Sequence, residues 1–210
     1  NMSLSATHSQ NTNTQVINMT LPTFQGSVSR VFPFAPKIGT KKGFLQNINI
    51  QYSVRGENRI QTTDSLFFKK EMFESAKSGF QHSIPISTNF KLFKYLSFST
   101  SANYNATMVF NTIERNFDIE NQEVVTVENK GYDAFSTYNF SASLGTTVYG
   151  MYDFANDKGI QAIRHVLRPS LSYSLAPAFD QYYDIYEVIS ADGLTTSEVE
   201  YSRFEGSIFG

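Results

Sequence analysis

The sequence predicts an all-β fold, and more specifically an antiparallel transmembrane β-barrel to which this chain contributes an internal fragment of about seven or eight long strands. Three observations lead to this prediction. Long segments alternate between apolar and small polar residues, and charged residues make up only 17% of the 210-residue chain. No apolar run approaches the ~18 residues of a membrane-spanning helix, so a closed barrel is the spanning structure that remains.

The clearest alternation runs from Leu96 to Phe110, where one face carries residues such as Phe98 and Tyr104 and the other carries Ser, Asn and Thr, including Asn103. A strand in a globular protein is usually ~5–6 residues long, whereas a tilted strand that crosses a bilayer needs roughly 9–11. A soluble β-sandwich would show the same alternation but would carry charge on its wet face. The polar face here is small and uncharged, which favours a strand between lipid and a hydrated lumen.

The composition agrees with this interpretation and excludes other classes. Aromatic residues make up 15% of the chain, and the charged fraction lies below the quarter that is typical of soluble domains. A net charge of −2 and a pI near 5.9 give no electrostatic footprint for nucleic acid. The absence of cysteine removes disulfides, thiolate chemistry and cysteine metal sites.

The same period of two predicts the other strands. A first strand starts at Met2, and a less regular one follows from Gln15 to Phe34. In chain order, the apolar positions of the later strands are Phe44, Ile48, Ile50, Tyr52 and Val54; Phe80, Ile84, Ile86, Phe90 and Leu92; Tyr138, Phe140, Ala142, Leu144 and Val148; and Ile163, Leu167, Leu171, Tyr173 and Leu175. We expect their outer faces to contact lipid, with aromatic contacts at Phe98, Tyr104, Phe110, Tyr138, Phe140 and Tyr173.

Basic side chains fall on the opposite parity. Arg55, Lys91, Arg164 and Arg168 all occupy polar-face positions, as does Asn103. A charge on the lipid face at the bilayer midplane costs ~2–4 kcal/mol, so a barrel requires this sorting. We expect these five residues to face the lumen. A lumenal ion pair or a solvated charge is one interpretation of such a residue, and contact with a transported ligand is the other.

The connections also alternate in character. The predicted links run from Asn11 to Thr14, Pro33 to Gly43, Asn58 to Ser78, Phe93 to Tyr95, Asn111 to Ala134, Gly150 to Gly159, and Ala178 to Tyr201. Outer-membrane barrels have short periplasmic turns and long extracellular loops. The long links that begin at Asn58, Asn111 and Ala178 are therefore assigned to the extracellular side, together with the short turn at Asn11.

Three prolines interrupt predicted strands. The apolar face changes parity around Pro22, and Pro85 and Pro169 lie within other alternating segments. Because proline cannot donate to a ladder, each position predicts a bulge or a break. A tolerated bulge is one interpretation, and a weakened wall that deforms during transport is the other.

The ordered motifs of the chain resemble the barrel of a divergent branch of the lipopolysaccharide-assembly family LptD. The motifs are Leu21-Pro22, Ser29-Arg30-Val31-Phe32-Pro33-Phe34, Tyr52-Ser53, Asn58-Arg59-Ile60, Thr63-Asp64-Ser65-Leu66, the run GFQHSIPISTNFKLFKYLSFSTSANYN, Ile163-Arg164-His165-Val166-Leu167-Arg168-Pro169-Ser170 and Tyr201-Ser202-Arg203-Phe204-Glu205-Gly206. They cover nearly the whole chain. The sequence differs from better-known members of the family in three respects. It has no cysteines, and it includes neither a periplasmic jelly-roll domain nor the terminal strands that form a lateral gate.

The resemblance implies a translocon in the cell outer membrane that inserts lipopolysaccharide into the outer leaflet through a polar lumen. Its partners would be lipopolysaccharide, a plug lipoprotein of the LptE type, a periplasmic lipopolysaccharide bridge and outer-membrane lipid. The candidates for contact with lipopolysaccharide or with the plug would be Arg55, Lys91, Asn103, Arg164 and Arg168. Residues 1–210 would then belong to one barrel domain that is incomplete at both ends. The alternatives are another outer-membrane transporter, such as a porin or a plugged uptake receptor, and a soluble β-sandwich adhesin.

Catalytic and metal chemistry are not predicted. His8, His82 and His165 lack ligand-like spacing, and no Ser/His/Asp set, phosphate loop or paired-carboxylate motif stands out. We therefore expect neither enzymatic activity nor a cofactor.

Overall fold

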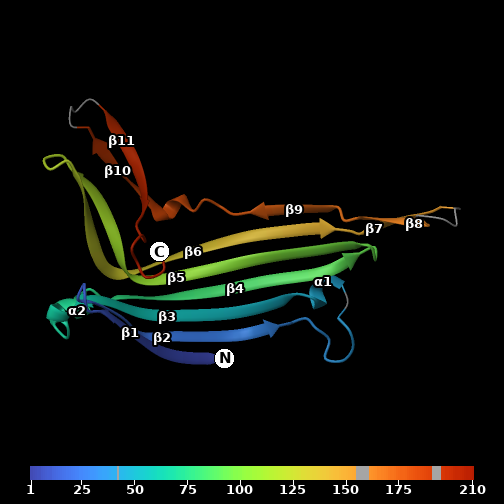
Figure 1. Ribbon diagram of the computed structural model, residues 1–210, viewed down its shortest axis with the longest axis horizontal. Coiled ribbons are helices and arrows are strands. Elements are labelled where there is room, and N and C mark those ends of the chain that lie inside the picture. The colour runs from blue at the N-terminus through green and yellow to red at the C-terminus, as the bar shows by residue number, and fades with distance from the viewer. Residues whose placement is uncertain (42, 155–160, 191–194) are drawn as a thin grey trace.

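The computed structural model describes residues 1–41, 43–154, 161–190 and 195–210, and this part of the chain is almost entirely β-structure (Figure 1). The strands are β1 (Met2–Asn11), β2 (Val16–Val31), β3 (Asn49–Thr63), β4 (Lys77–Leu92), β5 (Leu96–Asp118), β6 (Glu123–Gly145), β7 (Val148–Asp153), β8 (Ala162–Leu167), β9 (Ser170–Leu175), β10 (Tyr183–Ile189) and β11 (Thr196–Ser202). The short helices α1 (Gly43–Gln46) and α2 (Lys70–Glu74), with 3-10 turns at Asp64–Leu66 and Asp180–Tyr182, lie in the connections. No helix in the described residues has the length and apolar character needed to cross a membrane.

Seven strands form one antiparallel sheet in the order β1-β2-β3-β4-β5-β6-β9, and two hairpins, β7–β8 and β10–β11, extend from it (Figure 1). The sheet is an up-and-down meander in which each of the first six strands pairs with its neighbour in sequence. It is open, with β1 and β9 at its edges. The predicted all-β antiparallel class is confirmed, and the described strands do not close into a barrel.

The pairing register keeps the two kinds of residue apart across the sheet. One row joins Ile50, Ile86, Ala102, Phe140 and Leu175, whereas the next joins Asn49, Ser87, Ser101, Ser141 and Ser174. Paired residues of neighbouring strands lie on the same face, and a slip by one residue would exchange the faces. The sheet therefore has one apolar face and one face of hydroxyl and amide groups.

Two predicted loops are wrong. The segment from Asn111 to Ala134 continues β5 and β6 as a long hairpin, and only residues 119–122 form its turn. Most of the described part of the link from Ala178 to Tyr201 is the β10–β11 hairpin. Both segments carry charge on both faces, so they lack the apolar alternation used to predict strands, but backbone pairing in water does not require an apolar face.

The strand predicted from Phe44 begins only at Asn49, because Phe44 lies in α1. Other links follow the prediction more closely. The turn after Asn11 and the turn at Phe93–Tyr95 occur as predicted, while β3 runs five residues beyond Asn58, to Thr63. The predicted link from Gly150 to Gly159 falls partly on residues 155–160, which lie outside the described residues; the part before them belongs to β7 and the residue that follows it.

The three prolines each coincide with an irregularity of pairing. The β2–β3 register shifts between Thr20 and Thr23, around the cis Leu21–Pro22 bond. Opposite Pro85, the β3–β4 pairs skip Gln51 and Tyr52 and resume without a shift. At Pro169 the predicted strand from Ile163 to Leu175 is divided: β8 pairs with β7, and β9 pairs with β6.

A small core lies where α2 covers the apolar face at the start of β2 and the end of β3. Ile17, Met19 and Ile60 from the sheet pack with Met72 of α2, and all four side chains are buried. Truncation of such a buried residue to alanine lowers the free energy of unfolding by about 2–5 kcal/mol, because a cavity replaces the contacts. The cluster therefore anchors the connection between β3 and β4.

We predict that Ile60→Ala lowers the free energy of unfolding of the full-length protein by about 2–4 kcal/mol. Urea titration in detergent micelles measures this change. Ile38→Ala is the matched control, because Ile38 is 93% exposed whereas Ile60 is 5% exposed. Equal stability of the two variants would contradict the packing described for α2.

Candidate functional site: the polar face of the sheet

The polar face is organised by side-chain hydrogen bonds that run between strands. The Asn49 amide donates to the Ser87 carbonyl oxygen at 2.8 Å, and the Ser101 and Ser141 hydroxyl oxygens lie 2.8 Å apart. The Asn103 amide nitrogen donates to the Asn139 side-chain oxygen at 2.8 Å. These groups offer further donors and acceptors to whatever lies above the face, without any buried charge at these positions.

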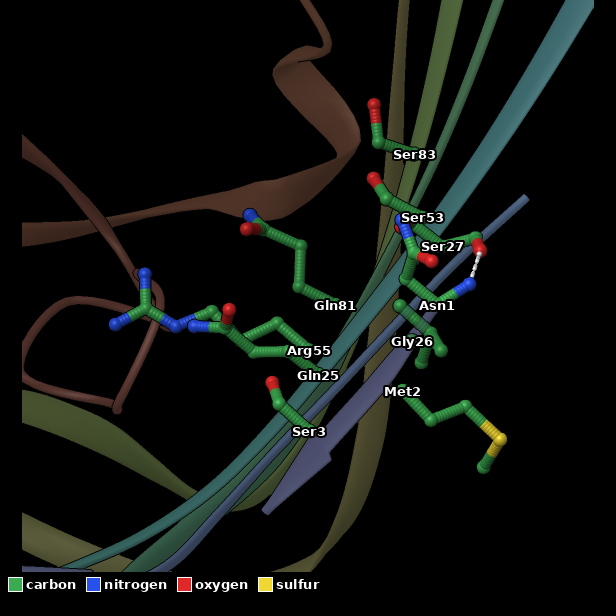
Figure 2. A pocket seen from close by; sticks show the side chains of 11 residues that line it. Asn1, Met2, Ser3, Gln25, Gly26, Ser27, Ser53, Arg55, Gln81 and Ser83 are labelled. Carbon is green, nitrogen blue, oxygen red and sulfur yellow. Dashed lines mark hydrogen bonds between the residues drawn. The ribbon is translucent and has the colours of Figure 1, made fainter. Parts of the chain in front are cut away.

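A hollow of about 460 Å³ opens on this face where β1 to β4 run side by side. In Figure 2 the side chains of Gln25, Arg55 and Gln81 extend to one side of the sheet, whereas Met2 extends the other way. Hydroxyls of Ser3, Ser53 and Ser83 complete the polar lining. The hollow can therefore hydrogen-bond a polar ligand and offers it one guanidinium group.

Arg55 is held by a buried carboxylate. Glu57 has a side chain that is only 3% exposed and lies between two arginines on the same face. Arg55 donates from Nε to Glu57 Oε1 at 2.6 Å, and Arg59 Nη2 lies 3.3 Å from Oε2. The cluster keeps one net positive charge and restricts the Arg55 side chain. Sequence reasoning missed Glu57, although the spacing Arg55, Glu57, Arg59 places all three on one face of a strand.

The C-terminal strap, defined as Tyr201–Gly210, folds over the polar face near the start of β4 and the middle of β5. Phe204 and Ile208 pack on Val109, which is fully buried, and Phe135, Tyr182 and Phe209 surround them. Gly79 leaves the room for this contact, because a Cβ atom there would lie 2.6 Å from Cγ2 of Ile208. A compact apolar cluster thus occupies a face that is otherwise polar.

Polar contacts tie the strap to the sheet around that cluster. Lys77 donates to the Gly206 carbonyl at 2.6 Å, Arg115 pairs with Glu205 at 3.0 Å, and the Arg203 carbonyl accepts from the Ile113 N–H at 2.9 Å. The Ser136 backbone N–H donates to the Tyr182 hydroxyl at 2.9 Å. Contacts with the Ser136 side chain and backbone lower the pKa of Tyr182. Because the ion pairs are partly exposed, the apolar cluster supplies most of the stabilisation.

The five predicted lumenal residues lie in four different places. Lys91 and Arg168 share a hollow of about 590 Å³ at the end of the sheet formed by the β4–β5 turn. Arg55 lines the hollow of Figure 2, and Asn103 belongs to the amide pair described above. The Arg164 guanidinium lies 4.8 Å from the centre of the Tyr149 ring in the β7–β8 hairpin.

The predicted lipid contacts lie at apolar positions of the register. Tyr104 pairs with Tyr138, and Phe140 and Tyr173 pair with Ala102 and Ala142. Phe98 pairs with Phe90 and Leu144. Phe110 lies at a register shift between β5 and β6, where the centre of its ring lies 6.0 Å from the centre of the Tyr132 ring.

Within the described residues no group of three or more His, Cys, Asp or Glu is placed to hold a metal ion.

These features define the class of protein as an all-β protein built on an antiparallel sheet of long strands. One face of the sheet is apolar, and the other carries hydroxyl and amide groups. The whole chain, residues 1–210, matches the family model described as LptD protein, and the chain therefore belongs to that family. The resemblance found in the sequence is confirmed, and membership supports a role in lipopolysaccharide transport and assembly at the outer membrane. No curated protein and no solved structure matches the chain.

We predict that Phe204→Ala releases the strap from the sheet. Loss of the ring from a fully buried position should lower the free energy of local opening by about 3 kcal/mol. Amide hydrogen exchange of residues 201–210 in the full-length protein measures this opening. Phe93→Ala, at an exposed turn position, is the control. Unchanged protection of the strap in Phe204→Ala would show that the apolar cluster does not hold it.

Proposed function

We propose that the chain forms part of the wall of an outer-membrane β-barrel that inserts lipopolysaccharide into the outer leaflet. In this proposal the apolar face contacts acyl chains and the polar face surrounds a hydrated lumen. The observation that carries the proposal is the register, which keeps apolar and polar rows separate from β3 to β9. Strands of 15 to 23 residues, as in β3 to β6, exceed the roughly 9–11 residues that a crossing needs.

The polar face suits the passage of an anionic saccharide. Moving such a group through hydrocarbon costs several kcal/mol for each polar group left unsatisfied. A lumen lined by Ser, Thr, Asn and Gln replaces hydrogen bonds to water without binding one sugar tightly. Arg55, Lys91, Arg164 and Arg168 add scattered positive charges that attract phosphate or carboxylate groups, or acidic residues of a plug lipoprotein of the LptE type.

The remaining partners follow from the same proposal. Lipopolysaccharide would arrive from a periplasmic bridge and leave through the barrel wall. The strap would lie inside the lumen and narrow it towards the end where the β5–β6 turn lies. The irregular pairing at Pro22, Pro85 and Pro169 would let the wall deform near those positions.

The two faces can be tested with neighbouring residues of β6. Phe140→Arg places a charge on the proposed lipid face, which should destabilise the folded protein in lipid bilayers by about 2–4 kcal/mol. Asn139→Arg adds the same charge on the opposite face and should cost much less. Unfolding of the full-length protein from lipid vesicles measures both. Equal destabilisation would exclude a bilayer on the apolar face and favour a soluble sandwich.

The transport role can be tested by charge reversal at Arg55, Lys91, Arg164 and Arg168, one position at a time. We expect reduced lipopolysaccharide at the cell surface, with the largest effect for Arg55→Glu, because that change also places two carboxylates side by side at Glu57. Surface labelling of lipopolysaccharide measures export. Normal export in all four variants would remove the proposed role of these charges. Normal lipopolysaccharide localisation after depletion of the protein would favour a porin or an uptake receptor.

A further inference from the structure

Two breaks in the strands lie side by side at one corner of the sheet. β6 ends at Gly145, and β9 begins at Ser170, its partner in the register. Between β6 and β7, the Thr146 backbone N–H donates to the Pro169 carbonyl at 3.1 Å, and the Thr146 hydroxyl donates to the Tyr95 carbonyl at 2.9 Å. The corner is where the seven-stranded sheet gives way to the β7–β8 hairpin (Figure 1).

Three cations gather around the hollow on the polar side of this corner. Lys91, Lys94 and Arg168 line it together with hydroxyl-bearing residues that include Ser97 and Thr147. None of the described lining residues is Asp or Glu, and none of the ion pairs among the described residues includes these cations. The hollow is therefore positively charged without an internal counter-ion.

The turn that carries Lys94 is held in an unfavourable backbone conformation. Phe93 and Lys94 have φ angles of 48° and 68°, and the Tyr95 N–H donates to the Leu92 carbonyl at 3.2 Å. Left-handed backbone costs roughly 1–2 kcal/mol for a residue with a Cβ atom. The strand pairing maintains this turn, and the turn places Lys94 beside Lys91 and Arg168.

An apolar hollow of about 270 Å³ lies at the same corner on the opposite face. Leu96, Leu144 and Leu171 line it, and Leu144 and Leu171 are register partners. The two hollows share four residues: Gly145, Thr146, Pro169 and Ser170. An apolar groove and a cationic hollow thus meet around the end of one strand, which is the arrangement that an anionic amphiphile fits.

We propose that this corner binds an anionic phospholipid, with the phosphate at Lys91, Lys94 and Arg168 and part of one acyl chain along Leu96, Leu144 and Leu171. The inference rests on the proposed function in so far as the apolar face must contact a bilayer. Charge complementarity selects a lipid with net negative charge. Phe93 and Tyr95 at this turn are 84% and 80% exposed, and aromatic side chains are enriched where membrane proteins meet the headgroup layer. The narrow apolar hollow fits one chain of a phospholipid better than the multiple chains of lipopolysaccharide.

The test uses the full-length protein in micelles of a neutral detergent and measures bound lipid by native mass spectrometry. Phosphatidylglycerol is the anionic probe, and phosphatidylcholine with the same chains is the zwitterionic one. We expect the native protein to retain phosphatidylglycerol at least tenfold better than phosphatidylcholine. The triple variant Lys91→Ser, Lys94→Ser, Arg168→Ser should lose this preference, and Leu171→Asn should weaken retention of phosphatidylglycerol.

The matched control is the triple variant Lys37→Ser, Lys69→Ser, Lys70→Ser, which removes the same charge and lines neither hollow. It should retain phosphatidylglycerol like the native protein. Equal loss in both triple variants, or no preference in the native protein, overturns the proposal. Displacement of phosphatidylglycerol by a lower concentration of purified lipopolysaccharide also overturns it, because the corner would then be a site for the transported lipid. If the lipid-binding test fails but Phe140→Arg destabilises the protein in bilayers much more than Asn139→Arg, only the lipid site is excluded and the proposed barrel stands.

Discussion

The structure depends on the register of its antiparallel pairs, because the register decides what each face of the sheet presents. Side chains in a strand alternate, so a slip of one residue between β4 and β5 would bring Ser101 of β5 to the face of Ile84 and Ile86 of β4. The register runs without a shift through the β3–β4 and β4–β5 pairs, whereas the β1–β2, β2–β3 and β5–β6 pairs contain shifts, among them those at Pro22 and next to Phe110. The two hollows, the amide and hydroxyl ladders and the strap all follow from these two faces.

The strap marks the place where the polar face changes character. From Ser97 to Thr107, the inward positions of β5 are Ser, Asn and Thr, but Val109 and Ile113 continue the same face as buried apolar residues. Between them Asn111 is buried, and neither of its side-chain polar atoms has a hydrogen-bond partner among the described residues. An unsatisfied buried amide costs about 1–3 kcal/mol. The strap is therefore bound by a strong apolar contact that also leaves a polar penalty, which reduces the cost of releasing it.

Much of this fold could be predicted from the period of two, and the failures have physical causes. The start of β3, most of β4, the part of β5 from Leu96 to Phe110 and the end of β6 were predictable because their residues alternate between apolar and polar with a period of two. The end of β5 and the start of β6 were not, since residues such as Glu114 and Glu128 pair through their backbone and interrupt the apolar alternation on both faces. The strap could not be placed from its own sequence. Its signal lay in its partners, because Val109 and Phe135 interrupt polar faces and Gly79 removes a side chain opposite Ile208.

The inversion of polarity along β5 also bears on where a bilayer would end. Before Phe110 the positions of this face are apolar apart from Thr100, but Thr112, Glu114 and Asn116 follow on the same side of the strand. A charge such as that of Glu114 is costly in hydrocarbon and free in water, so the outward apolar band must stop near Phe110, where the contact with Tyr132 places two aromatic rings together. At the other end, Phe93 and Tyr95 occupy the turn beside the cationic hollow. The two aromatic groups bracket the uncharged stretch from Leu96 to Phe110, and the charged positions of β5 and of the β4–β5 turn lie outside it. The same stretch carries the regular polar ladder, so the part of the sheet whose apolar face would suit lipid is the part whose polar face would suit a saccharide.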